Sequence, residues 1–209
     1  LIRTTSQHME IDSDSYGPMN SQTTLKILQY NVRKSRDIVM ATLLCDPRVM
    51  EYDVLAIQEP WRNPFMSTTH HPAKAHFHLC YPAAIEGGPA RVCFFINKRL
   101  NNTTWQFKSH TGDACSLRIQ YEKNDQAQGC IYIHNIYNPG QTTENRDSVL
   151  PLILTLLETH QLDDQIVLGD FNLHHRSWGG ERVLREDEEA EELKTIMDRF
   201  GLTSTLHEG

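Results

Sequence analysis

The feature that most constrains the fold is a series of short apolar runs of β-type residues, each bounded by turn residues. We predict strands at LKILQYN (25–31), DVLAIQEPW (53–61), ARVCFFINK (90–98), TTWQFKSH (103–110), CSLRIQYE (115–122), GCIYIHNIY (129–137), QIVLGD (165–170) and GLTST (201–205). Helices are predicted at 35–44, 144–160 and 186–200. Because these helices do not alternate regularly with the strands, the pattern favours an α/β fold with mixed sheets over a plain parallel sheet. Two stacked sheets with helices outside fit it, although periodicity alone does not choose among such sandwiches.

The remaining segments set the domain boundaries. Residues 1–24 are polar and lack a sustained period, so we expect a flexible tail followed by one domain over 25–209. The segment 62–90 is rich in Pro, His and Gly, which predicts a long surface loop with little regular structure. The chain opens on Leu1 rather than methionine, which suggests a fragment or a processed product.

Composition excludes several classes of protein. The apolar runs are too short to cross a bilayer, so we expect no membrane segment. The five cysteines are odd in number and form no CxxC pair, which argues against a disulfide framework and favours an intracellular compartment. A net charge of -7 argues against a protein that wraps nucleic acid electrostatically, but not against an enzyme that contacts phosphates in one cleft.

Four of the predicted strands stop abruptly at polar residues. These residues are Asn31 in LQYN, Glu59 in AIQE, Tyr137 and Asn138 in HNIYNPG, and Asp170 and Asn172 in VLGDFN. A single such ending is usually a strand that leaves the core and caps a turn. Four of them predict a shared cleft, because strand ends on one rim of a sheet converge.

These residue types suit metal-assisted phosphodiester hydrolysis. Glu59 can bind a hard cation such as Mg²⁺, and Asn31 can hold that carboxylate or a metal-bound water. Asp170 can orient or deprotonate an attacking water. Asn172 and Tyr137 can donate hydrogen bonds to a phosphate oxygen on which negative charge develops.

At this point the chain resembles a known family. The segments LQYNVRKS (28–35), LAIQEPW (55–61), NIYNPG (135–140) and VLGDFNLHHRSWGG (167–180) are similar, in order and spacing, to motifs of the endonuclease/exonuclease/phosphatase superfamily of deoxyribonuclease-I-like fold. The run GDFNLHHRSWGG most resembles the apurinic-type endonuclease domain of non-LTR retrotransposons. The similar region covers roughly residues 25–205.

The resemblance implies a four-layered α/β sandwich and a Mg²⁺-dependent enzyme, with Mn²⁺ as an alternative ion. It implies that the enzyme nicks DNA in the nucleus, leaving a 3′ hydroxyl that primes a reverse transcriptase domain of the same polyprotein. By this resemblance Glu59 and Asn31 bind the metal, and Asp170, Asn172 and Tyr137 are catalytic. We further expect Asn138, His174 and His175 to contact the substrate. One position departs: Gly140 stands where repair members have asparagine, which removes a phosphate donor.

Family members end with two further strands that carry an aspartate and a final Asp-His pair. This chain stops at GLTSTLHEG, so we expect the final strands and that histidine to be missing and the activity to be impaired. His207 lacks the preceding aspartate and is not given the role.

The paired histidines, the acidic run and the function itself each have an alternative interpretation. His174 and His175 lack the partners of a zinc site, and we expect them to shape the loop beside the cleft or to touch the substrate. The acidic run 185–192 is interpreted as a solvated helix face without a catalytic role. The alternatives to a retrotransposon nuclease are a repair-type apurinic endonuclease or phosphatase of the same superfamily, and a non-catalytic remnant.

Overall fold

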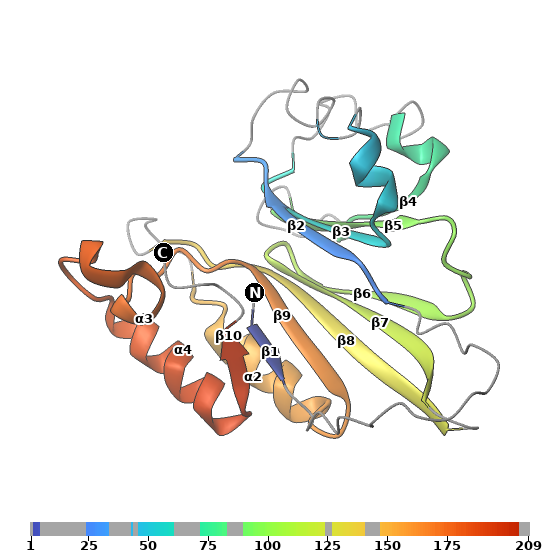
Figure 1. Cartoon of the computed structure of the whole chain (residues 1–209). Coiled ribbons are helices and arrows are strands. Elements are labelled where there is room, and N and C mark those ends of the chain that lie inside the picture. Colours follow the sequence, from blue (N-terminus) through green and yellow to red (C-terminus); the bar gives the residue numbers. More distant parts are fainter. Residues whose placement is uncertain are drawn as a thin grey trace, which may run out of the picture.

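The fold is two β-sheets stacked face to face, with helices on the outer face of one of them (Figure 1). The structure is a computed structural model, and it describes residues 2–4, 24–33, 43, 46–60, 72–82, 90–123, 127–140 and 147–204. Both sheets mix parallel and antiparallel pairs, so the predicted mixed sandwich is confirmed.

The smaller sheet has four strands in the order β2-β3-β5-β4. Its strands are β2 (Ile27–Asn31), β3 (Val54–Gln58), β4 (Phe77–Cys80) and β5 (Val92–Asn97). Strands β2 and β3 are parallel, and the other pairs are antiparallel. Every residue of β3 and β5 is buried, which explains their continuous apolar sequences, because both faces of these central strands are covered.

The larger sheet has six strands in the order β10-β1-β9-β8-β7-β6. Its strands are β1 (Ile2–Thr4), β6 (Trp105–Thr111), β7 (Ala114–Lys123), β8 (Ala127–Tyr137), β9 (Asp164–Asp170) and β10 (Leu202–Ser204). Strands β8 and β9 are parallel. The short β1 pairs antiparallel with both β9 and β10, so residues 2–4 are a strand inside the segment that was predicted to be a flexible tail.

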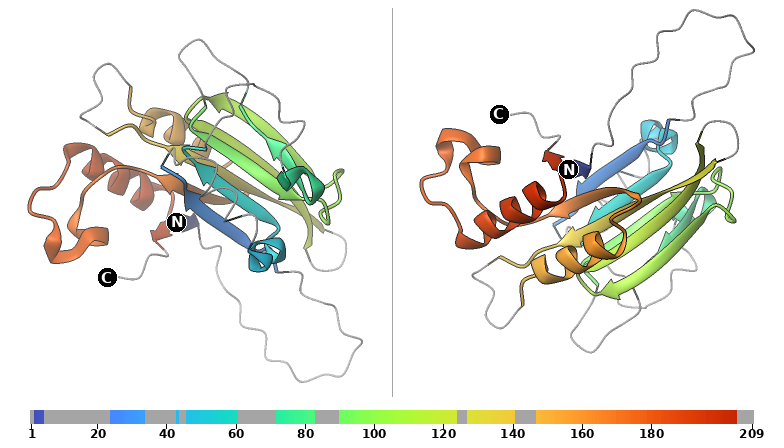
Figure 2. Two further views of the ribbon diagram at one scale, coloured as in Figure 1. Left: turned by 90° about the horizontal axis from the view of Figure 1, so that it is seen from above. Right: turned by 90° about the horizontal axis from the view of Figure 1, so that it is seen from below.

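The helices lie mainly on the outer face of the larger sheet (Figure 2). Helix α2 (Leu150–Thr159) follows β8, and α4 (Glu188–Arg199) precedes β10. Between β9 and α4 the chain forms the short α3 (Arg176–Gly179) and the 3-10 turn η4 (Gly180–Arg182). On the smaller sheet the described covering elements are the 3-10 turns η1 (Pro47–Glu51) and η3 (Pro72–Ala75).

Three apolar clusters hold these layers together. The cluster between the sheets joins side chains of β3 and β5 to side chains of β7, β8 and β9, among them Val54, Phe94, Leu117, Ile133 and Leu168. A second cluster packs α2 and α4 on the larger sheet, and a third packs η1 and η3 on the smaller one. The layer order is therefore helix, sheet, sheet and turns, and the rims of the two sheets lie next to each other.

The structure changes some predicted boundaries. The segment 62–90 was predicted as an irregular loop, but its described part contains η3 and β4, and β4 forms because it pairs with β5. The helix predicted at 35–44 falls outside the described residues except for Leu43. Among the helices that the structure describes, none is both long and apolar enough to cross a membrane.

Candidate active site

The predicted site lies where two parallel strand pairs end. In the smaller sheet Asn31 ends β2 opposite Gln58 of β3, and Glu59 follows directly. In the larger sheet Tyr137 ends β8 opposite Asp170, the last residue of β9. Because carboxyl ends of parallel strands lie at the same edge, each pair brings its polar residues together.

Asp170 connects the two sheets at this edge. Its Oδ2 accepts a 2.5 Å hydrogen bond from Nδ2 of Asn31, and its Oδ1 accepts a 3.2 Å bond from the backbone N–H of Asn172. The amide oxygen of Asn31 in turn accepts the backbone N–H of Arg33 at 2.7 Å. The carboxylate is therefore held in one orientation by donors from both sides.

Tyr137 contacts Glu59 across the same gap. Its hydroxyl is hydrogen-bonded to the carboxylate of Glu59. Burial, and then the negative charge of Glu59, raise the pKa of Tyr137 above its usual 10, while the charge of Arg91 acts in the opposite direction. The phenol therefore keeps its proton at neutral pH and can serve as a hydrogen-bond donor.

Backbone strain is concentrated at this site. Among the described residues, the non-glycine positions with positive φ are Arg33 (53°), Glu59 (48°) and Asn172 (49°). Such a conformation costs about 1 kcal/mol or more and persists where the surrounding structure enforces it, often at functional sites. Two of the three are residues that the sequence predicts for catalysis or metal binding.

Gly169 lets β9 deliver Asp170 to the edge. Its φ is 142°, and a Cβ at this position would lie 1.9 Å from the carbonyl oxygen of Ile136 on β8. Only glycine allows the two backbones to approach this closely. Gly169 of the GDFN motif is therefore required for the packing of β9 against β8. The next residue, Asp170, is predicted to be required for catalysis.

Asn172 and Asn138 are tied to the scaffold. Nδ2 of Asn172 donates to the carbonyl oxygen of Asn138 at 2.7 Å, and one proton of that amide is left for a ligand. The side chain of Asn138 is fully buried, with Oδ1 accepting the N–H of Val149 and Nδ2 donating to Glu189. These contacts fix the start of α2, and the substrate-binding role of Asn138 stays a prediction.

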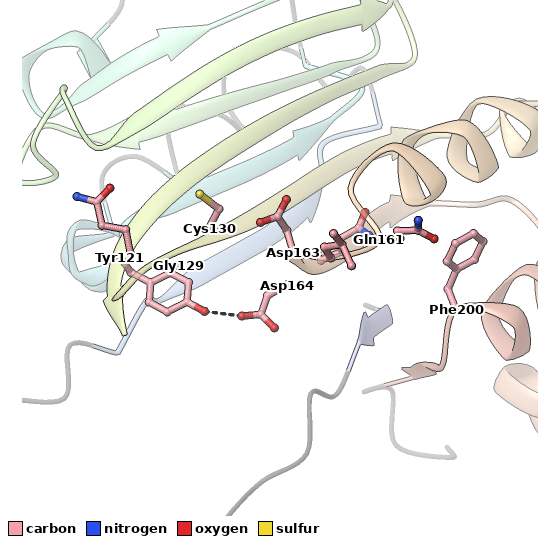
Figure 3. Close-up of a pocket in the computed structure, with 10 residues that line it drawn as sticks. Tyr121, Gly129, Cys130, Gln161, Asp163, Asp164 and Phe200 are labelled. Atoms are coloured by element: carbon pink, nitrogen blue, oxygen red, sulfur yellow. Dashed lines mark hydrogen bonds between the residues drawn. The ribbon is translucent and has the colours of Figure 1, made fainter. Parts of the chain in front are cut away.

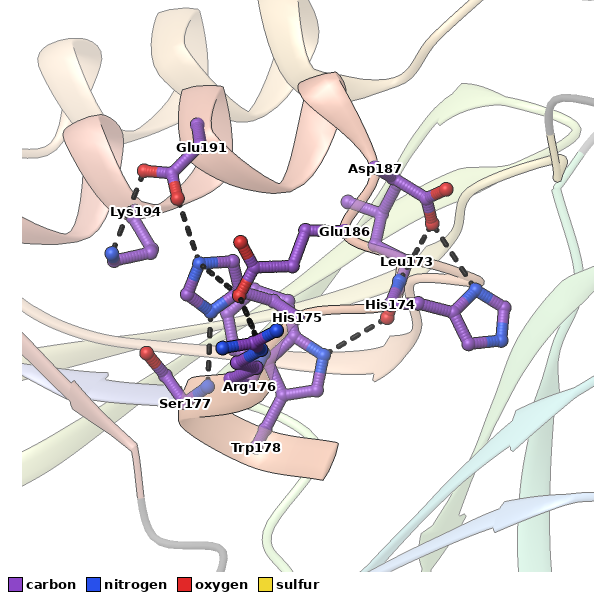
Figure 4. Close-up of polar contacts among 10 residues, drawn as sticks. All are labelled: Leu173, His174, His175, Arg176, Ser177, Trp178, Glu186, Asp187, Glu191 and Lys194. Atoms are coloured by element: carbon purple, nitrogen blue, oxygen red, sulfur yellow. Dashed lines mark hydrogen bonds and ion pairs between the residues drawn. The ribbon is translucent and has the colours of Figure 1, made fainter. Parts of the chain in front are cut away.

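His175 anchors the loop that follows the GDFN motif (Figure 4). The residue is 5% exposed, and its Nδ1 accepts the backbone N–H of Ser177, capping α3. Its Nε2 lies 2.7 Å from Oε1 of Glu191 on α4, and its ring is 4.9 Å from that of Trp178. Trp178 donates to the carbonyl of Leu173, so the HHRSW run forms a packed corner.

His174 lies beside this corner with its ring largely exposed. Its backbone N–H and its Nδ1 both contact Oδ2 of Asp187, at 2.7 and 3.1 Å. The contact with the backbone N–H of His174 holds the pKa of Asp187 below its usual value. Contact of either histidine with a substrate stays a prediction.

The ligand atoms of His175, Glu186 and Glu191 lie within 4.8 Å of one another, a spacing that could hold a metal ion. A neutral imidazole has one N–H, and Nδ1 of His175 is the acceptor for Ser177, so the proton sits on Nε2. Nε2 then donates to Glu191 and has no lone pair for a metal. We therefore interpret the cluster as a hydrogen-bonded corner.

Sequence reasoning missed the structural use of the acidic run. Glu186, Asp187 and Glu191 contact the histidine corner, and Glu189 accepts from Asn138 and Ser148. The run is therefore more than a solvated helix face. No local signal reveals this, because His175 and Glu191 are 16 residues apart.

A cavity of about 390 Å³ lies at the opposite ends of β8 and β9 (Figure 3). It is lined by residues that include Tyr121, Cys130, Asp163 and Asp164. The hydroxyl of Tyr121 donates to Asp164 at 2.5 Å, and this hydrogen bond is the main cause that raises the pKa of Tyr121 to about 12. None of the predicted site residues lines this cavity.

Three comparisons with known proteins were made: with family models, with curated proteins and with solved structures. Residues 131–209 match a family model described as endonuclease-reverse transcriptase. No curated protein matches the chain in sequence. The catalytic domain of Xenopus laevis APE2 is similar in structure, with a TM-score of 0.52 and 15% identity over 84% of this chain and 67% of that chain.

The human Nocturnin catalytic domain with bound sulfate anion has a TM-score of 0.42 and 16% identity over 72% of this chain and 64% of that chain. The chain thus spans about two thirds of the length of each of these structures. The likeness to APE2 shows that the two chains share a fold, and residues 131–209, which make up less than half of this chain, are similar to the endonuclease-reverse transcriptase family.

Proposed function

We propose that the chain is the endonuclease of a reverse-transcriptase polyprotein and hydrolyses a phosphodiester bond of DNA with the help of a divalent cation. The observation that carries this proposal is a pair of contacts between the two sheets: Asn31 binds Asp170, and Glu59 binds Tyr137. The endonuclease-reverse transcriptase match supports the polyprotein context.

Each residue has a role that its contacts support. Asp170 is held by Asn31 and by the N–H of Asn172, and in this fixed orientation it aims and deprotonates the attacking water. Tyr137 is a protonated phenol whose single O–H proton is directed at Glu59; when that carboxylate binds the cation, the proton is released to a phosphate oxygen on which negative charge develops. Asn172 adds a second donor from its free amide proton.

The oxygen donors at the site fit a hard cation. The carboxylate of Glu59 and the amide oxygen of Asn31 would hold Mg²⁺, or Mn²⁺ in its place, with water and phosphate oxygens completing the coordination. When bound, the cation withdraws charge from the phosphate and stabilises the leaving oxygen. The product is a nick with a 3′ hydroxyl, which primes reverse transcription in the nucleus.

A plasmid-nicking assay tests the proposal. Supercoiled DNA should convert to open circles with Mg²⁺ and not with EDTA, and Asp170→Asn or Glu59→Ala should lower the rate by about 100-fold or more. Asp198→Asn and Glu192→Gln are matched controls, because both residues are exposed on α4, and they should keep the wild-type rate. Full activity of Asp170→Asn would overturn the assignment.

The substrate separates the alternatives. The assay is run both on the 209-residue chain and on a chain extended to the end of its reading frame. Cleavage confined to abasic duplexes, or phosphate release from a small molecule, would indicate a repair enzyme or a phosphatase. A chain whose DNA binding does not respond to Mg²⁺ in fluorescence anisotropy would be a non-catalytic remnant.

A further inference from the structure

A buried arginine joins the two sheets beside the site. Arg91 precedes β5 in the smaller sheet and is 7% exposed. Its Nε and Nη2 donate to the two carboxylate oxygens of Asp113, which lies in the turn between β6 and β7 of the larger sheet. This two-point contact fixes the plane of the guanidinium.

The same guanidinium covers a predicted catalytic side chain. Its Cζ lies 4.5 Å from the centroid of the Tyr137 ring. Arginine can bind a carboxylate with two hydrogen bonds and stack flat on an aromatic ring at once, whereas lysine can do neither. The geometry at this position therefore depends on the shape of the side chain as well as on its charge.

Backbone hydrogen bonds extend the contact to both partners of the Tyr137–Glu59 pair. The N–H of Glu59 donates to the carbonyl of Arg91 at 2.7 Å, and the N–H of Tyr137 donates to the carbonyl of Asp113 at 2.8 Å. The N–H of Arg91 donates to Gly112 at 2.6 Å. With the bond from the Tyr137 hydroxyl to Glu59, these contacts form a closed ring that crosses between the sheets.

We propose that Arg91, held by Asp113, is a positioning residue that sets the Tyr137 hydroxyl against Glu59 for the reaction. This inference rests on the proposed function. Arg91 is buried beneath the ring, so it acts through Tyr137 and through the backbone of Glu59 rather than by touching DNA. The ring of contacts keeps a phosphate donor and a metal-binding carboxylate in fixed register although they belong to different sheets.

A second arginine provides the matched control. Arg99 lies at the other end of β5, and its Nε donates to Asp53 at 2.8 Å while its guanidinium also reaches the carbonyls of Met50 and Glu51. This ion pair is remote from Tyr137. Arg99→Lys reproduces the loss of an arginine–carboxylate contact without touching the site.

The test measures the position of Tyr137 separately from activity. The full chain is labelled with ¹³Cζ-tyrosine, the Tyr137 signal is assigned from Tyr137→Phe, and NMR spectra are compared at neutral pH for wild type, Arg91→Lys, Asp113→Asn and Arg99→Lys. We expect Arg91→Lys and Asp113→Asn to shift the Tyr137 signal and Arg99→Lys to leave it unchanged. In the nicking assay, Arg91→Lys should lower kcat by about 10-fold or more with KM for DNA within about 3-fold.

The outcomes separate this inference from the proposed function. A wild-type protein that does not nick DNA would contradict the proposed function, and the NMR comparison would still decide whether Arg91 positions Tyr137. A folded Arg91→Lys variant with the wild-type Tyr137 signal and wild-type kcat would overturn the inference. If Arg91→Lys does not fold, Asp113→Asn decides, since it weakens the same contact and keeps the backbone carbonyl that binds Tyr137.

Discussion

The side-chain amide of Asn31 donates a 2.5 Å hydrogen bond to the carboxylate of Asp170, and this bond joins the ends of β2 and β9 across 139 residues of sequence. It is a direct polar link between the two sheets at the candidate site, in addition to the Arg91–Asp113 contact. Whatever binds at this edge therefore meets a carboxylate whose direction is set by the opposite sheet.

Replacing Asn31 with aspartate tests whether this edge binds a cation. Asn31→Asp turns the hydrogen bond into a contact between two carboxylates, so the melting temperature in EDTA should fall by about 2–4 °C, equivalent to about 1 kcal/mol. Mg²⁺ should raise it more than in wild type, because a further carboxylate binds the ion. Differential scanning fluorimetry measures both shifts. Asn101→Asp, in an exposed turn, should show neither, and an unchanged Mg²⁺ response in Asn31→Asp would exclude the edge as a cation site.

Gly169→Ala should be far more destabilising than Gly201→Ala. A Cβ at Gly169 would lie 1.9 Å from the oxygen of Ile136, whereas a Cβ at Gly201, at φ 60°, meets no atom within 4 Å. We expect a loss of about 1 kcal/mol at Gly201 from conformation alone and of about 3 kcal/mol or more at Gly169. Urea unfolding of the two variants gives the comparison, and similar losses would mean that β8 and β9 separate easily.

His175 should stabilise the loop without a metal. His175→Ala removes the cap of α3 and the partner of Glu191, which should cost about 2 kcal/mol, whereas His175→Asn keeps an acceptor for the N–H of Ser177 and should cost less. His174→Ala, at an exposed ring, should change stability by about 0.5 kcal/mol or less. A Zn²⁺-dependent rise in the wild-type melting temperature that disappears in His175→Ala would instead establish a metal site.

His134 should make the fold sensitive to acid. Burial lowers the pKa of this β8 residue from 6.5 to about 4. The unfolded chain takes up a proton on it near pH 6.5 and the folded chain only near pH 4. The contribution of neutral His134 to the free energy of unfolding is therefore fully present above pH 6.5. It decreases by about 3 kcal/mol as the pH falls from 6.5 to 4.

The measurement compares urea unfolding of wild type and His134→Gln between pH 7 and 4. Other titrating groups are common to both proteins, so the wild type should lose about 3 kcal/mol more. Parallel stability curves would contradict the assignment. The contacts fit a neutral ring: Nε2–H donates to Gln165, whose amide nitrogen donates to the carbonyls of Leu157 and His160, and Nδ1 accepts from the hydroxyl of Ser116.

The parts of the fold that follow local rules could be predicted from the sequence. Strands such as β5 and β9 are continuous apolar runs that stop at turn residues, and α4 shows a helical period. The convergence of Asn31 and Asp170 follows from the same rules, because both end a strand that lies in a parallel pair. Their catalytic roles remain predictions.

The parts that depend on distant partners could not be predicted. Strand β4 has only four residues, and their sequence does not by itself predict a strand. Hydrogen bonding to β5 stabilises the extended conformation. Glu191 looks like a solvated helix residue until α4 is placed beside His175. No local pattern marks Arg91, because the Asp113 that fixes it lies in a turn of the larger sheet.

The position of β1 bears on the order in which the protein assembles. Ile2 pairs with Val167 on one side and with Ser204 on the other, so β1 joins two strands that lie far along the sequence from it. Such long sequence separations slow folding, because the entropy of closing a large loop is lost before the strand pairing stabilises the chain. The edge of β9, which carries Asp170 at its end, is therefore closed late, and we expect the rim of the larger sheet to be completed only after synthesis has passed residue 204.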